Sequence, residues 1–168
     1  IDDGSTDHSS TICDRYASKD HRIIVLHKEN EGLVKARKDG MSIATGDYIL
    51  YVDGDDWIEA DMVEKLYLAI IDKQVDVAMC GRYEDTGSTC RKKGKYDEYA
   101  LMQQVYPNMI VNNDFFEWGI FPGVWDKLFK RERLELLQLQ VDNRITMGED
   151  ALCTYPYLLN ANSIYILD

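Results

Sequence analysis

Short apolar runs alternate with amphipathic stretches through the first half of the chain. The nearly continuous apolar runs predict buried strands, and they occupy residues 22–27, 47–52 and 75–80. Apolar residues at three- and four-residue spacing predict helices, and these occupy residues 5–20, 32–46 and 59–73. Strands that alternate with helices of this length form right-handed βαβ units. The pattern therefore predicts an α/β fold with a mainly parallel sheet and helices on both faces.

The pattern changes in the second half. Residues 81–99 are polar with a small basic cluster, and residues 112–134 are rich in aromatic residues, with glycine and proline among them. We interpret this half as a less regular region appended to the sheet, with no further βαβ repeat. Near the end, residues 148–161 predict a helix that Pro156 interrupts or kinks, and residues 163–167 predict a final strand.

Composition favours a single domain over residues 1–168. Hydrophobic residues make up 45% of the chain and aromatic residues 11%, which suits one continuous core. The formal net charge of -11 argues against a protein that neutralises nucleic-acid phosphates or anionic lipid. A ligand that carries phosphate would therefore need positive charge supplied locally.

The cysteine spacing and the length of the apolar runs indicate in which cellular compartment the protein is expected. The four cysteines form no C-x-x-C pair, and no histidine lies at metal-ligand spacing from them. This argues against a zinc site or a disulfide framework and indicates reduced thiols in a cytosolic protein. No run of 18 apolar residues and no basic-then-apolar start is present, so we expect neither a transmembrane span nor a secretion signal.

A cluster of acids follows the second predicted strand, in the stretch YVDGDDWIEAD. Ligands of open α/β sheets bind beyond the carboxyl ends of the strands. Asp53 and Asp55 share one side of an extended chain, and Asp56 joins them if the chain turns at Gly54. Carboxylates that close repel one another unless a hard cation lies between them, which predicts a divalent metal site.

The acids have two other interpretations. An EF-hand loop that begins at Asp53 fails, because Ile58 stands where that loop requires glycine. Helix capping explains Glu59 and Asp61 well but leaves Asp53 and Asp55 unexplained.

A second acidic strand end is IDDGSTD at the start of the chain, where Asp2 and Asp3 precede a glycine turn. Turn and capping chemistry would produce much the same string. From the residues alone, a ligand role for Asp3 and a purely structural one both stay open.

Together, IDDGSTD, ENEGLVKARKDGMSIATGDYILYVDGDDWI and MGEDALCTYPYLL resemble the family 2 glycosyltransferases, in order and in separation. The resemblance covers nearly the whole chain and implies the Rossmann-like GT-A fold. Members of that family ordinarily begin with a strand and a helix upstream of the DDGS segment. The resemblance therefore implies a chain cut at both ends, which should expose a sheet edge and apolar surface.

The resemblance also implies roles on the donor side. Asp3 would contact the base or ribose of a nucleotide-sugar, and Asp53, which also faces the donor, would form with Asp55 and Asp56 a DXD-type site for Mn²⁺ or Mg²⁺. Asp55 is the leading direct ligand. Such an all-oxygen site suits these ions, and a diphosphate cannot lie against several carboxylates without one. Arg37 would add positive charge on the nucleotide side, with a solvated helix face as the alternative.

On the acceptor side, the resemblance makes Asp150, of the pair Glu149 and Asp150, the base of an inverting single displacement. From the residues alone, a Glu-Asp pair that opens a helix is more often a favourable N-terminal charge than a catalytic base. Residues 1–80 would form the nucleotide-sugar half and residues 81–168 the acceptor half. In the acceptor half, the aromatic side chains of residues 112–134 could line an acceptor pocket or belong to the core. Trp125 and Trp118 are expected at the acceptor ahead of Phe115, Phe116 and Phe121.

The implied partners are a UDP-sugar donor and a saccharide or lipid-linked saccharide acceptor. The setting would be surface polysaccharide assembly in the cytoplasm, at the inner face of the membrane. Peripheral membrane association and homo-oligomerisation of the full-length protein are compatible with this. Two alternatives remain: a nucleotidyltransferase on a related scaffold, which has no need of a base in the MGED segment, and a non-catalytic module that binds nucleotide or sugar.

Overall fold

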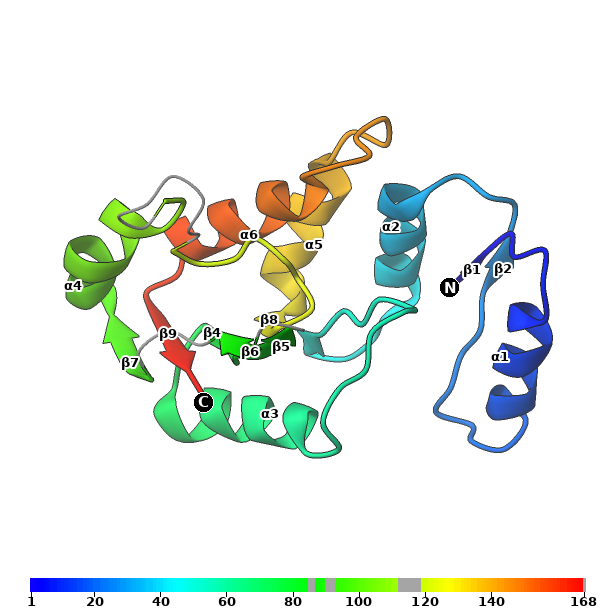
Figure 1. Cartoon of the computed structure of the whole chain (residues 1–168), viewed down its shortest axis with the longest axis horizontal. Helices are drawn as coiled ribbons and strands as arrows, with labels where there is room; N and C mark the ends of the chain where they lie inside the picture. Colours follow the sequence, from blue (N-terminus) through cyan, green and yellow to red (C-terminus); the bar gives the residue numbers. More distant parts are fainter. Residues whose placement is uncertain (85–86, 90–92, 112–118, 168) are drawn as a thin grey trace. The chain divides into compact units, whose positions relative to one another are not determined.

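The computed structural model describes residues 1–84, 87–89, 93–111 and 119–167. Within this part of the chain, two compact units are present (Figure 1). The first unit comprises Ile1–Thr45 and Gln138–Glu149, and the second comprises Gly46–Leu137 and Asp150–Asp168. This structural division is separate from the expected functional halves at residue 80, which stay a prediction.

The first unit is built on two short parallel strands, in which Asp2 lies opposite His27. Its strands are β1 (Asp2–Asp3) and β2 (His27–Lys28), and its helices are α1 (Ser9–Ala17) and α2 (Leu33–Ile43). A tight turn follows β1 at Gly4, whose φ is 76°. A Cβ atom there would lie 2.7 Å from the backbone nitrogen of Asn30, so this turn requires glycine.

The predicted buried strand at 22–27 is wrong. The chain becomes a strand only at His27, and the side chains of Ile23 and Ile24 are 39% and 68% exposed. In the described residues β2 pairs with β1 alone, over two positions, so no sheet covers these apolar side chains. Ile23 and Ile24 therefore contribute apolar surface to the outside of the first unit.

The second unit contains a five-stranded sheet in the order β3-β8-β4-β9-β7. Its strands are β3 (Tyr48–Ile49), β4 (Val77–Met79), β7 (Gly94–Asp97), β8 (Lys127–Lys130) and β9 (Ser163–Ile166). Strands β5 (Arg82–Glu84) and β6 (Gly87–Thr89) form a separate antiparallel pair.

The α/β class is confirmed, but the expected mainly parallel pairing does not hold in this sheet. Only β4 and β9 are parallel, and the other three pairings are antiparallel. Two of these pairings arise from β8, a strand that the sequence did not reveal, which inserts between β3 and β4 and runs against both. The third arises from the edge strand β7, which runs against β9. The predicted strand at 47–52 is shortened to β3, which lies at the sheet edge and has one neighbour.

Helices cover both faces of this sheet (Figure 1). On one face lies α3 (Met62–Lys73), which buries Leu66, Ala69 and Ile70 in a core with β4. On the other lie α5 (Arg131–Gln140) and α6 (Glu149–Leu159), the latter with Pro156 inside it as expected. The predicted helices at 59–73 and 148–161 and the strands at 75–80 and 163–167 are thus confirmed.

A short helical run follows β7 and completes the second unit. It consists of α4 (Glu98–Ala100), a π-helical turn (Leu101–Val105) and a 3-10 turn (Tyr106–Asn108). Leu101 and Val105 are buried in it. Among the described residues, none of the helices has the length and apolar character needed to cross a membrane.

The hydroxyl of Tyr157 connects α6 to the backbone of the sheet region by two hydrogen bonds. The hydroxyl accepts a hydrogen bond from the Lys130 N–H and donates one to the Asp76 carbonyl, both at 3.0 Å. Burial raises the pKa of Tyr157 to about 12. Tyr157→Phe should keep the ring contact with Phe129 but remove the partner of the Lys130 N–H and of the Asp76 carbonyl, which costs about 1–3 kcal/mol.

Hydrogen exchange of the sheet amides measures this loss as a lower free energy of opening of the second unit. Tyr99→Phe is the matched control, because Tyr99 is 74% exposed. Equal exchange rates in the two variants would contradict the prediction.

Candidate functional site

The acid cluster forms a turn rather than an extended strand. The Asp56 N–H donates to the Asp53 carbonyl oxygen at 3.1 Å, and Gly54 and Asp55 occupy the turn between them. Asp53 is half-buried, while Asp55 and Asp56 are exposed. Because the chain turns here, Asp53 and Asp55 lose the shared side that an extended chain would give them.

No group of three or more His, Cys, Asp or Glu side chains placed to hold a metal ion occurs among the described residues. The expected convergence of Asp53, Asp55 and Asp56 on one cation is therefore not seen. Mg²⁺ usually binds through one or two carboxylates, with water and substrate phosphates as its other ligands. The exposed carboxylates of Asp55 and Asp56 fit such an open site, whereas a closed protein cage does not fit.

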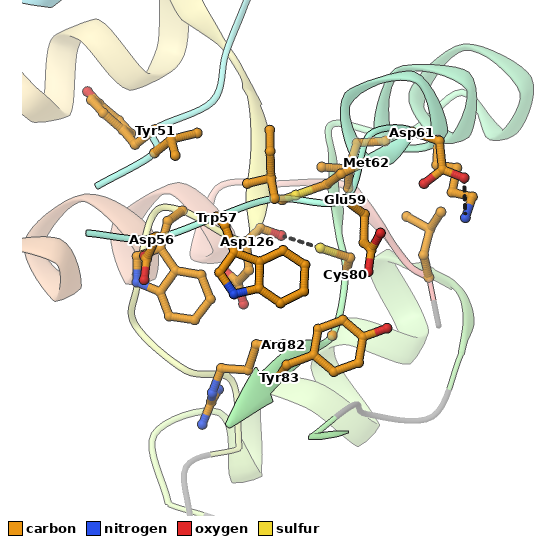
Figure 2. A pocket seen from close by; sticks show the side chains of 17 residues that line it. Tyr51, Asp56, Trp57, Glu59, Asp61, Met62, Cys80, Arg82, Tyr83 and Asp126 are labelled. Carbon is orange, nitrogen blue, oxygen red and sulfur yellow. Dashed lines mark hydrogen bonds and ion pairs between the residues drawn. The ribbon is translucent and has the colours of Figure 1, made fainter. Parts of the chain in front are cut away.

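A cavity of about 460 Å³ lies in the second unit, between the turn and the start of α3 (Figure 2). Asp56 lines it, and so does Trp125 from the aromatic stretch much further along the chain. Asp53, Asp55 and Asp150 are not among its lining residues. The cavity thus brings together one residue expected at the metal and one expected at the acceptor.

Two aromatic residues form one side of this cavity. The rings of Trp57 and Tyr83 are stacked, with centroids 5.8 Å apart and planes 9° apart (Figure 2). Both side chains are 69% exposed. Neither residue was predicted to have a role. The sequence signal for Trp57 is its place in the middle of an acid cluster, where helix capping does not require an aromatic ring.

Trp125 is held by its own loop. Its indole packs against Phe121 at a centroid distance of 5.6 Å. A Cβ atom on Gly123 would lie 2.8 Å from the Trp125 Nε1 and 2.9 Å from the Phe121 Cε1, so a side chain there would displace both rings. Trp118, the other expected acceptor residue, and Phe115 and Phe116 lie outside the described residues.

A buried lysine organises this loop. The Lys127 ammonium is fully buried and donates to the carbonyl oxygens of Phe121 at 2.9 Å and Gly123 at 2.8 Å, and to the Asp126 carboxylate. The Asp126 carbonyl in turn accepts from the Cys80 N–H at 3.0 Å, at the end of β4. Asp126 lines the cavity, and a lysine inside the apolar run VWDKLF is the sequence signal for this arrangement.

In the first unit, Asp2 and Asp3 have different partners. Asp2 accepts from the Ser5 N–H at 3.0 Å and lies 2.7 Å from the His27 Nδ1. Hydrogen bonding by the Ser5 side chain, then by His27 and then by the Ser5 N–H, lowers the pKa of Asp2 to about 2. Asp2 is thus the residue that stabilises the turn, as the structural interpretation of IDDGSTD required.

Asp3 faces the start of α2. Its carboxylate accepts from the Lys28 ammonium at 2.8 Å and from the backbone N–H groups of Glu31 at 3.1 Å and Gly32 at 2.8 Å. Burial opposes ionisation, but these hydrogen bonds outweigh it and lower the pKa of Asp3. Asp3 is therefore an oriented, ionised acid at the carboxyl end of a strand, where ligands of α/β sheets bind.

The structure joins two more expected site residues, Arg37 and Glu149. The Arg37 Nη1 lies 3.4 Å from the Glu149 Oε1, and their side chains are only 7% and 12% exposed. The solvated helix face considered for Arg37 is therefore wrong. Glu149 is the first residue of α6, so this ion pair fixes the residue next to Asp150. Lys35, on the same helix as Arg37, forms an ion pair with Asp39.

Residues 1–133 match the model of the family described as Glycosyl transferase family 2. The chain belongs to this family. It is 44% identical to the glycosyltransferase GlyG of Streptococcus pneumoniae, with 100% of the chain and 57% of GlyG covered. It is 34% identical to the glycosyltransferase GlyA of the same species, with 99% of the chain and 24% of GlyA covered. The chain thus spans between a quarter and somewhat over half of these relatives.

Solved structures of Staphylococcus aureus TarS share the fold. TarS 1–349 superposes with a TM-score of 0.72 at 22% identity, covering 99% of this chain and 47% of that one. A second TarS structure, in complex with UDP-GlcNAc, gives a TM-score of 0.71 at 23% identity, covering 99% and 45%. The expected GT-A fold is confirmed.

His27 connects two carboxylates and makes the first unit sensitive to pH. Its Nε2 lies 3.0 Å from Asp14 and its Nδ1 2.7 Å from Asp2. These contacts, with that of Asp14 the larger, raise the pKa of His27 above its usual 6.5. Because the folded pKa is the higher one, the stabilisation is complete below pH 6.5 and is lost as pH rises through the folded pKa.

We expect the stability of the first unit to fall as pH rises from 6 to 9, and His27→Gln to flatten this dependence. Hydrogen exchange of the Asp2 and Ser5 amides across this range is the measurement, with His21→Gln as the matched histidine substitution. A wild-type protein whose exchange protection rises between pH 6 and 9 would contradict the assignment.

Proposed function

We propose that this chain forms the donor-binding part, and some of the acceptor side, of an enzyme that transfers a sugar from a UDP-sugar to a carbohydrate hydroxyl. The proposal includes dependence on Mn²⁺ or Mg²⁺ and inversion at the anomeric carbon. One observation carries it: Asp56 of the acid cluster and Trp125 of the aromatic stretch line the same cavity. Membership of family 2 supports sugar transfer over nucleotidyl transfer.

On the donor side, Asp3 is the proposed contact for the base or ribose, and Asp53 and Arg37 lie on the nucleotide side. Asp55, with Asp56, would hold the divalent ion, whose positive charge stabilises a departing diphosphate. That a structure of TarS contains UDP-GlcNAc supports UDP as the nucleotide. The chain has a net charge of -11, so a diphosphate needs a local positive charge in order to bind. The ion held by these acids would supply that charge.

The proposed chemistry is a single displacement. The acceptor hydroxyl oxygen forms a bond to the anomeric carbon, and the bond from that carbon to the diphosphate oxygen breaks. The nucleoside diphosphate leaves with the electron pair. Asp150 takes the proton of the hydroxyl, and Glu149, paired with Arg37, holds the preceding position at the start of α6.

Metal dependence is the first test of this proposal. We expect UDP to bind the full-length protein only with Mn²⁺ or Mg²⁺, and Asp55→Asn to weaken that binding at least about tenfold, since a direct carboxylate ligand is lost. Isothermal titration calorimetry measures both effects. Asp72→Asn, an exposed acid on α3, is the matched control. Equal UDP affinity in excess chelator would remove the metal from the proposal.

The base is tested separately. Asp150→Asn should keep UDP affinity and lower the rate of transfer by about 10²–10⁴-fold, the usual contribution of a positioned general base. The readout is release of UDP from the donor in the presence of acceptor. Glu132→Gln, an exposed acid on α5, controls for the loss of one negative charge. Normal turnover in Asp150→Asn would exclude this residue as the base, and loss of UDP affinity would make it a donor contact.

A further inference from the structure

The stacked pair of Trp57 and Tyr83 has no function in the scheme above. Large aromatic side chains are usually well buried, yet both of these are 69% exposed. They come from different segments, Trp57 from the loop after the acid turn and Tyr83 from β5, and their planes differ by only 9°. Their exposure means that ring surface stays open to solvent beside the cavity.

The charges around the cavity restrict what can bind there. Its lining includes four acids and two bases: Asp56, Glu59, Asp61, Asp126, Lys65 and Arg82. The Lys65 ammonium already pairs with Asp61 at 2.8 Å, and the Arg82 guanidinium lies over the Phe121 ring at 4.2 Å. Asp61 is neutralised by this pair, and Asp126 is paired with the Lys127 ammonium, which leaves Asp56 and Glu59 against Arg82. The side chains of the lining thus supply no net positive charge to hold an anionic ligand such as a polyol phosphate.

We propose that Trp57 and Tyr83 form an acceptor subsite for a neutral pyranose ring. A pyranose has flat faces of C–H groups that pack on aromatic rings, and hydroxyl groups at its rim that donate hydrogen bonds to carboxylates. Glu59 provides such an acceptor in the same lining, while Asp56 is left to the divalent ion of the proposed function. The cavity volume of about 460 Å³ is within the range of small-molecule sites.

This subsite belongs to the acceptor in the proposed function, on which the inference rests. Tyr83, Trp125 and Asp126 come from the half of the chain after residue 80, where acceptor contacts were expected. The proposed subsite narrows the acceptor to an uncharged sugar. The family resemblance alone is compatible with a charged or an uncharged saccharide.

The test is saturation-transfer NMR on the full-length protein with methyl β-D-glucopyranoside, methyl β-D-galactopyranoside and ribitol 5-phosphate as probes. We expect at least one glycoside to bind and ribitol 5-phosphate not to. Trp57→Ala should weaken glycoside binding about tenfold, while Trp57→Phe, which keeps a ring, should retain most of it. Tyr83→Ala should also weaken it, and Tyr99→Ala, which removes an exposed tyrosine outside the cavity, should not.

Circular dichroism verifies that each variant is folded. Stronger binding of ribitol 5-phosphate than of either glycoside, no binding of any probe, or equal effects of Trp57→Ala and Tyr99→Ala would overturn the subsite. UDP binding to the wild-type protein with Mn²⁺ is measured in parallel. UDP binding without glycoside binding refutes the subsite alone, whereas glycoside binding without UDP binding refutes the donor site and with it the proposed function.

Discussion

The second unit depends on one buried positive charge, the ammonium of Lys127. A fully buried ammonium is stable only if acceptors surround it, because it has lost its hydration. Its acceptors are two carbonyl oxygens and one carboxylate from the six residues before it. This requirement folds the loop back over the start of β8, and β8 lies inside the sheet. The same interaction thus ties an inner strand of the sheet to the position of Trp125 and Asp126 at the cavity.

The acids of the two units are in different states. Asp2 and Asp3 each accept several hydrogen bonds from within the first unit, which keep them ionised and oriented. Asp55 and Asp56 are exposed on a turn, where water meets their hydrogen-bonding needs. An acid already satisfied by the fold can align a ligand through its remaining lone pairs, whereas an exposed acid is available to a metal ion. This contrast is the physical basis for assigning them to different parts of a nucleotide-sugar.

Patterns that depend on local spacing could be predicted from the sequence. Helix α3 and strand β4 followed from apolar periodicity because both are buried against each other. Strand β8 could not be predicted, since it has lysines at both ends and its apolar centre is only two residues long. The strand predicted at 22–27 was wrong for the opposite reason. The segment is apolar enough for a strand, but no sheet packs against it in the part of the chain that the structure describes.

The residues of the candidate site also divide into those that could be predicted from the sequence and those that could not. Asp56 and Trp125 were found because acids after a strand and tryptophans in a glycine-rich stretch are informative by themselves. The partnership of Trp57 with Tyr83 exists only once β5 brings the second ring to the first, so neither residue was informative alone. Arg37 was expected near a nucleotide, but only the fold reveals that Glu149 is its neighbour.

Gly123 has a mechanical consequence for the cavity. A Cβ atom at this position would come within 3.0 Å of the rings of both Phe121 and Trp125, and the Arg82 guanidinium lies above Phe121. A side chain at position 123 would push on both rings, and through Phe121 on the guanidinium above it. The absence of a side chain at this position thus allows Trp125 to keep its place in the lining of the cavity.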